Sequence, residues 1–169
     1  MLRLFDLLNA ELEARGASAE LYLVGGAVMC LALGARDATR DATRDVEALF
    51  KPVAIIREAA ARVAIVAGVP NSWLNDAVKA FLSAHGDFDQ YLERSHLSVF
   101  VAQPAYLLAM KCLAMRLGEE SHDLDDVRYL LRYLNITTAK EALAIVTRYF
   151  DEAAIPIKTR LALEEILGA

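Results

Sequence analysis

Two acidic residues, Asp45 and Glu47, stand two positions apart in the sequence. In a β-strand, residues two apart point to the same side, so both carboxylates would lie on one face. Hard divalent cations such as Mg²⁺ bind few carboxylates and complete their coordination with water and phosphate oxygens. The spacing therefore predicts that Asp45 and Glu47 hold one or two Mg²⁺ or Mn²⁺ ions against a phosphorylated ligand.

Gly25 and Gly26 follow a short apolar run, Leu21 to Val24, and precede a stretch of good helix formers. A backbone without side chains approaches phosphates closely, and the start of the following helix offers free N–H groups and a positive dipole end. Each motif alone is weak, because paired glycines are usually a structural turn and an acidic pair is usually a solvated strand face. Their order (strand, glycine turn, helix, acidic strand) favours a metal-nucleotide site.

The elements expected around these motifs form an α+β fold. Leucines at helical spacing predict a helix over Leu2 to Arg15, closed by Gly16. Apolar runs and their glycine and proline boundaries predict strands over residues 21–24 and 45–50 and helices over residues 27–33 and 53–67. A hairpin is expected between residues 88 and 102, with alternating apolar residues in its second strand.

Between the helix at 53–67 and the hairpin, we expect one further short helix, capped by Asn71 or Ser72. Its inner face would consist of four apolar residues, Trp73, Ala77, Val78 and Phe81.

From residue 105 onward every periodic segment is helical, with helices expected over 106–117, 124–134, 139–150 and 157–167. Thr138 and Glu141 form a capping-box pattern at the start of the third. We therefore expect a core over residues 1–104 and a helical C-terminal extension, packed on that core, over residues 105–169.

These motifs resemble the nucleotidyltransferase superfamily of the DNA polymerase beta type, through Leu23 to Gly26 and Arg44 to Leu49. The chain is more closely similar to the bacterial branch that includes the nucleotidyltransferase toxins of abortive-infection toxin-antitoxin systems. That likeness covers nearly the whole chain and rests on Val24–Ala27, Ala38–Arg40 or its copy, Trp73–Val78, Tyr106–Lys111 and Asp123–Asp126.

The resemblance implies a minimal mixed sheet flanked by helices. It also implies transfer of a nucleoside monophosphate from a nucleoside triphosphate to a hydroxyl acceptor, which would be a protein, an RNA end or a small molecule. Gly25 and Gly26 would cradle the triphosphate, while Asp45 and Glu47 would be catalytic and would bind Mg²⁺ or Mn²⁺.

Four further residues would bind nucleotide by the same resemblance, namely Arg44, Lys111, Asp123 and Asp126, and Lys111 would also be catalytic. Lys111 lies on an otherwise apolar helix, where a lysine that extends to the surface is an equal interpretation. The aspartates open a helix, so capping and compensation of the helix dipole explain them equally well.

Two features depart from the family pattern. Many members have a third carboxylate on a later strand, but residues 97–102 contain no acid, and the nearest substitutes are Asp76 and Asp89. In addition, 18 residues separate Gly26 from Asp45, because a four-residue unit is repeated at 37–40 and 41–44. The repeat lengthens either a helix or a surface loop, and its composition slightly favours the loop.

The composition limits the other function classes. The 169 residues carry a net charge of −5, which disfavours an extended nucleic-acid surface. The longest uncharged run, residues 21–35, is shorter than the ~20 residues that cross a bilayer, so we expect no membrane contact. The N-terminal segment carries acidic residues and has no signal-peptide cleavage pattern, so we expect a cytoplasmic location. An alternative to the enzyme is a catalytically weak nucleotide- or partner-binding protein, bound to a toxin or antitoxin partner.

Overall fold

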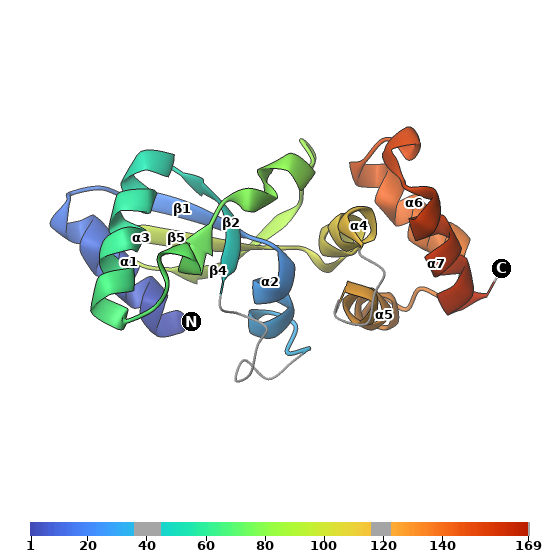
Figure 1. The fold of residues 1–169 in the computed structure, drawn as a ribbon, viewed down its shortest axis with the longest axis horizontal. Helices are drawn as coiled ribbons and strands as arrows, with labels where there is room; N and C mark the ends of the chain where they lie inside the picture. The colour runs from blue at the N-terminus through green and yellow to red at the C-terminus, as the bar shows by residue number, and fades with distance from the viewer. Residues whose placement is uncertain (36–44, 116–122, 169) are drawn as a thin grey trace. The chain divides into compact units, whose positions relative to one another are not determined.

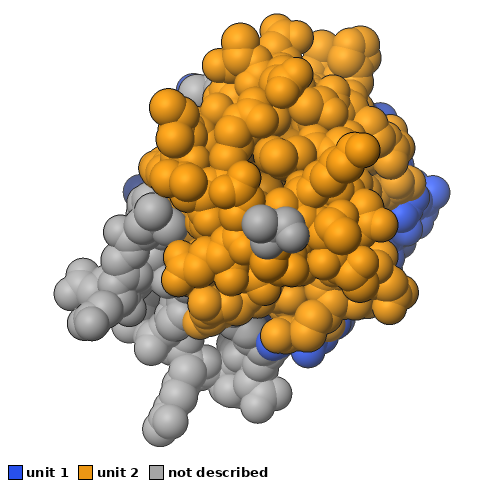
Figure 2. Space-filling view, turned by 90° about the vertical axis from the view of Figure 1, so that its right-hand side faces the viewer, with its two compact units in different colours: residues 1–80, 88–101 blue, residues 81–87, 102–169 orange. Residues whose placement is uncertain are grey.

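The computed structural model describes residues 1–35, 45–115 and 123–168. Residues 37–44, which hold the repeat, lie outside these ranges. The chain divides into two compact units: residues 1–80 with 88–101, and residues 81–87 with 102–169 (Figure 2). The expected α+β fold is confirmed, with a mixed sheet in the first unit and helices in the second.

The sheet of the first unit has five strands in the order β3-β2-β1-β5-β4 (Figure 1). The strands are β1 (Ala19–Leu23), β2 (Val46–Lys51), β3 (Leu74–Asn75), β4 (Phe88–Glu93) and β5 (Leu97–Ala102). β1 pairs antiparallel with β2 and parallel with β5, and β2 pairs parallel with β3. β4 and β5 are neighbours joined by three residues, a connection short enough only for the expected antiparallel hairpin.

Helices α1 (Leu2–Ala14) and α3 (Val53–Ala67) cover one face of this sheet (Figure 1). Alternate strand residues are buried beneath them, among them Leu21, Leu23, Val46, Ala48, Phe50, Leu97 and Val99. The side chains between these residues lie on the other face and keep partial exposure, among them Glu20, Tyr22, Glu47, Leu49, Ser98 and Phe100. Period-two burial thus assigns Glu47 to the face opposite α1 and α3.

The expected short helix over residues 71–81 is wrong. Two 3₁₀ turns, Asn71–Trp73 and Ala77–Phe81, flank the two-residue strand β3. The Trp73 indole N–H donates to the Ala60 carbonyl at 3.0 Å, and its ring is only 1% exposed. The buried Trp73 side chain holds Leu74 and Asn75 against the edge of β2. Hydrogen bonds to that strand replace the hydrogen bonds that a helix would have made.

The second unit contains α4 (Pro104–Ala114), α5 (Asp123–Tyr133), α6 (Ala139–Tyr149) and α7 (Ile157–Leu167). The predicted capping box is present: Glu141 N–H donates to Thr138 Oγ1 at 3.2 Å, and Thr138 N–H donates to Glu141 Oε2 at 3.1 Å. None of the helices in the described ranges is long and apolar enough to cross a membrane.

Residues 81–87 belong to the second unit, although they lie within the core expected over residues 1–104. Two tyrosines hold the segment: Tyr106 Oη accepts from Ser83 N–H at 2.9 Å, and Tyr149 O–H donates to Asp87 Oδ2 at 2.8 Å. Ser83 O–H also donates to the Tyr149 carbonyl at 2.6 Å. These bonds join the segment to α4 and to the end of α6.

The Tyr149 hydroxyl makes the free energy of unfolding depend on pH in the alkaline range. Burial and the hydrogen bond to Asp87 raise its pKa from 10.0 to about 12. Because this pKa is raised in the folded state, the contribution of the Tyr149 hydroxyl to the free energy of unfolding is complete below pH 10. That contribution is lost as pH rises toward 12. We expect wild type to be more stable than Tyr149→Phe below pH 10, with the difference shrinking above it. Urea unfolding across this range measures the difference, and a constant difference would contradict the prediction.

Candidate functional site

The carboxylate of Glu47 lies directly against Gly25. β1 and β2 are in register with Leu23 opposite Ala48, and Val24 N–H donates to the Glu47 carbonyl at 3.0 Å. The turn after β1 is therefore fixed to the residue that carries the acid. A Cβ atom built on Gly25 would collide with Glu47 Oε2. The structure thus brings together the glycine turn and one of the two predicted metal ligands.

The backbone conformation also favours glycine at position 25. Its φ angle is 66°, in the left-handed region that side-chain-bearing residues rarely adopt. Helix α2 (Gly25–Leu31) begins at this residue, so it starts at the glycine pair and not at Ala27 as expected. Gly26 is partly buried in its first turn.

Gly25→Ala should therefore impair both folding and the site. The left-handed conformation alone costs about 1–2 kcal/mol for alanine, and the new methyl group would also displace the Glu47 carboxylate. Gly68→Ala is the matched control, because Gly68 has a φ of 68° but open space around its Cα. We expect similar losses of unfolding free energy in both variants and loss of Mg²⁺-triphosphate affinity only in Gly25→Ala. Equal affinities in both variants would show that displacing Glu47 has no consequence for binding.

Asp45 is exposed and directly precedes the first residue of β2. Its Oδ1 atom accepts a hydrogen bond from Ser72 Oγ at 3.4 Å. Asp45 and Glu47 flank Val46, which is 2% exposed and belongs to the covered face. The acidic pair is thus at the start of β2, next to the residues that lead into β3. Arg44, the predicted neighbour of the pair, lies outside the described residues.

The two substitutes for a third acid have different surroundings. Asp76 is bound by Arg57 of α3, with N···O distances of 2.9 and 3.1 Å, and by Lys79. The hydrogen bonds from Lys79 and Arg57 lower the pKa of Asp76, while burial opposes them. Asp89 lies on β4, three strands away from β2 in the sheet order. Since adjacent strands are about 4.8 Å apart, the backbones are separated by roughly 14 Å.

The residue in register with Glu47 on the neighbouring strand is Asn75. Its Oδ1 atom accepts a hydrogen bond from Ala77 N–H at 3.2 Å. The resemblance implies a third acid on the strand at residues 97–102, but these residues form β5, which pairs with β1 and not with β2. Asn75 lies in the stretch Trp73–Val78 that carries the resemblance, but it was assigned no role because its segment was expected to be helical. Two apolar residues followed by Asn75 and Asp76 are a weak signal for an edge strand.

Lys111, Asp123 and Asp126 form a cluster in the second unit. Lys111 Nζ is 2.9 Å from Asp126 Oδ2 and 3.3 Å from Asp123 Oδ1. The three side chains are 15%, 3% and 11% exposed, in the order Lys111, Asp126, Asp123. The structure therefore brings together three of the predicted nucleotide-binding residues and gives the lysine two carboxylate partners.

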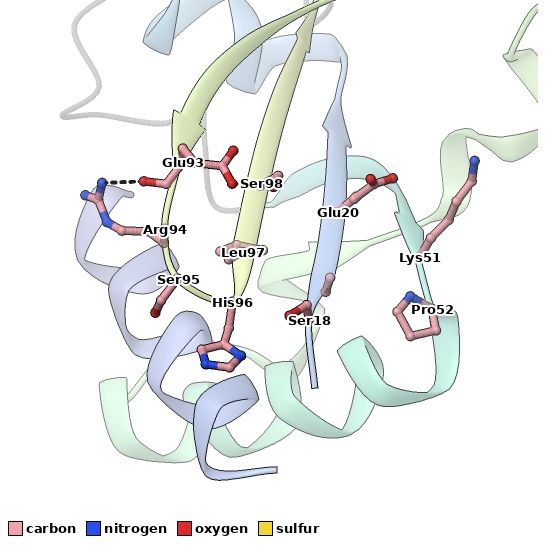
Figure 3. Close-up of a pocket in the computed structure, with 11 residues that line it drawn as sticks. Ser18, Glu20, Lys51, Pro52, Glu93, Arg94, Ser95, His96, Leu97 and Ser98 are labelled. Atoms are coloured by element: carbon pink, nitrogen blue, oxygen red, sulfur yellow. Dashed lines mark hydrogen bonds between the residues drawn. The ribbon is translucent and has the colours of Figure 1, made fainter. Parts of the chain in front are cut away.

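A groove of about 510 Å³ lies beside the start of β1 and the end of β2 (Figure 3). Gly25 and Glu47 lie at the opposite ends of these two strands. Its walls come from the start of β1, the end of β2 and the β4–β5 connection, and they include Ser18, Glu20, Lys51, Glu93, His96 and Ser98. Several of these groups already have partners: Glu93 accepts from Ser98, and His96 Nδ1 lies 2.9 Å from the Ala17 carbonyl. None of the catalytic, nucleotide-binding or metal-binding residues predicted from the sequence lines this groove.

Comparison of the chain with protein-family models, curated proteins and solved structures finds no match. Its function therefore has to be inferred from the chemistry of the site.

The donor set at the start of β2 suits Mg²⁺ or Mn²⁺. Among the described residues, no group of three or more His, Cys, Asp or Glu side chains could hold a metal ion. Asp45 and Glu47 supply two hard carboxylate ligands, and Mg²⁺ commonly takes one or two such ligands together with water and substrate phosphates. Glu47 beside the glycine turn would place such an ion next to bound phosphate.

Proposed function

We propose that this chain is a metal-dependent nucleotidyltransferase that transfers a nucleoside monophosphate from a nucleoside triphosphate to a hydroxyl acceptor. The observation that carries the proposal is the contact between the Glu47 carboxylate and Gly25, at the turn between β1 and α2. A triphosphate lying along that turn would be within reach of the acidic pair. The glycine pair and the acidic pair thus act as one site.

In the proposed reaction, the acceptor hydroxyl gives up its proton to solvent and its oxygen bonds to the α-phosphorus, while the bond from that phosphorus to the bridging oxygen breaks and pyrophosphate leaves with the electron pair. Bound Mg²⁺ supplies neutralisation of the phosphate charge. Asp45 and Glu47 would hold the ion, and the backbone at Gly25 would position the phosphates. Such positioning accounts for a large part of catalysis in phosphoryl transfer.

The proposal gives the cluster of Lys111, Asp123 and Asp126 a structural role and not a direct role in nucleotide binding. Lys111 Nζ is already paired with Asp126 at 2.9 Å and with Asp123 at 3.3 Å, so it attracts a triphosphate weakly while it keeps these partners. We therefore propose that Lys111 mainly holds α5 to α4. Any contact with phosphate would require it to exchange partners.

The alternative is a catalytically weak nucleotide- or partner-binding protein of a toxin-antitoxin-like system. The position of Asn75 favours it, because an amide stands in register with Glu47 where a third carboxylate would help to activate an acceptor. The toxin or antitoxin partner and the cytoplasmic location are part of the proposal in either form.

The experiment that tests the proposal is incubation of the purified chain with each α-labelled triphosphate, Mg²⁺ or Mn²⁺, and lysate of its own cells. We expect label to appear in an acceptor together with pyrophosphate, for wild type and for Glu165→Gln, an exposed glutamate on α7. Glu47→Gln should transfer about a hundredfold less label. Triphosphate binding without transfer would favour the alternative, and neither binding nor transfer would contradict both.

A further inference from the structure

We infer that Asn75 is a third polar group of the nucleotide site and that its amide nitrogen donates a hydrogen bond to a phosphate oxygen. The inference rests on the proposed function and extends it to a residue outside the glycine pair and the acidic pair.

Strand register places Asn75 beside Glu47. β3 runs parallel to β2, with Leu74 opposite Val46 and Asn75 opposite Glu47. Leu74 and Val46 are 7% and 2% exposed and belong to the covered face of the sheet. Because side chains alternate along a strand, Asn75 and Glu47 share the other face, with their backbones about 4.8 Å apart. Both side chains are partly exposed and so are accessible to a ligand.

One hydrogen bond fixes which end of the amide is available. Ala77 N–H donates to Asn75 Oδ1 at 3.2 Å, so the acceptor end is occupied within the turn after β3. The other end is an NH₂ group, which has two donors and no acceptor capacity. In the described part of the chain, Nδ2 donates to no acceptor. The donors are therefore available to a ligand that comes to the face that Glu47 shares.

The chemistry of an NH₂ group selects phosphate over metal. Mg²⁺ and Mn²⁺ are bound by oxygen ligands, and the amide oxygen is engaged by Ala77. A phosphate oxygen accepts hydrogen bonds and carries negative charge, which strengthens them. Asn75 is thus expected to contribute to triphosphate affinity without contributing to the affinity for the metal alone.

Calorimetry of the full chain separates these two affinities. Mn²⁺ is titrated alone, and then each of the four common ribonucleoside triphosphates is titrated at saturating Mn²⁺. The variants are Asn75→Ala, Asn75→Asp and the control Asn71→Ala, an exposed asparagine in the same connection. Circular dichroism verifies folding, and Asn75→Asp retains an oxygen that can accept from Ala77.

We expect Asn75→Ala to weaken triphosphate binding about tenfold and to leave Mn²⁺ binding within about twofold. Asn75→Asp adds a third carboxylate beside Glu47 and should tighten Mn²⁺ binding several-fold. The inference is overturned if Asn75→Ala leaves triphosphate affinity unchanged, if it weakens Mn²⁺ alone equally, or if Asn75→Asp does not tighten Mn²⁺. Wild type that binds no triphosphate with Mn²⁺ would instead overturn the proposed function, and the inference with it.

Discussion

Glu47→Gln should reduce pyrophosphate release and Mg²⁺-triphosphate affinity by about a hundredfold or more, because even outer partners of a metal site are worth 10–100-fold and Glu47 would bind the ion directly. The fold should change little. Neutralising one of two nearby acids relieves their repulsion, so the free energy of unfolding should stay within about 1 kcal/mol of wild type. Asp45→Asn should behave in the same way.

Enzyme-coupled detection of pyrophosphate and urea unfolding together test this prediction, with Glu165→Gln as the control. Full activity in Glu47→Gln would leave the acidic pair as an ordinary solvated strand edge. A large loss of stability would show instead that Glu47 is needed mainly to complete the turn at Gly25.

Lys111→Met should destabilise the second unit by about 3 kcal/mol, because it removes the ammonium group that lies 2.9 Å from Asp126 Oδ2 and 3.3 Å from Asp123 Oδ1 in a buried cluster. Asp126 is only 3% exposed, so water cannot replace the ammonium group effectively. Lys140→Met, an exposed lysine on α6, is the matched control and should cost less than about 0.5 kcal/mol. Thermal and urea unfolding measure the difference.

Stability and triphosphate affinity of this variant together distinguish a structural lysine from a phosphate ligand. A structural lysine predicts that Lys111→Met loses stability while the folded variant keeps wild-type affinity for Mg²⁺-triphosphate. A variant with wild-type stability but much weaker triphosphate binding would contradict the structural role and assign Lys111 to the ligand.

The sequence was sufficient for elements whose signals are local. The helix at Val53–Ala67 was predicted with its observed bounds, since a proline precedes it and Gly68 ends it in the left-handed conformation. The capping box at Thr138 is equally local. The contact of Glu47 with Gly25 also followed from sequence, because both motifs lie at the ends of strands that pair directly.

The features that sequence missed depend on tertiary pairing. A two-residue strand such as β3 has no periodicity, and a possible N-cap followed by apolar residues at helical spacing favoured a helix. Sheet order decides that Asn75, and not a residue of β5, is the neighbour of Glu47. Likewise, the contact of Asp76 with Arg57 spans 19 positions and joins a loop to α3, which no local pattern encodes.

The most direct test of the central claim is calorimetric titration of wild type with a non-hydrolysable triphosphate, with and without Mg²⁺. The contact of Glu47 with Gly25 predicts binding that requires Mg²⁺ and is lost in both Asp45→Asn and Glu47→Gln. Equal affinity with and without the metal, unchanged in both variants, would contradict a metal-nucleotide site and leave the partner-binding alternative.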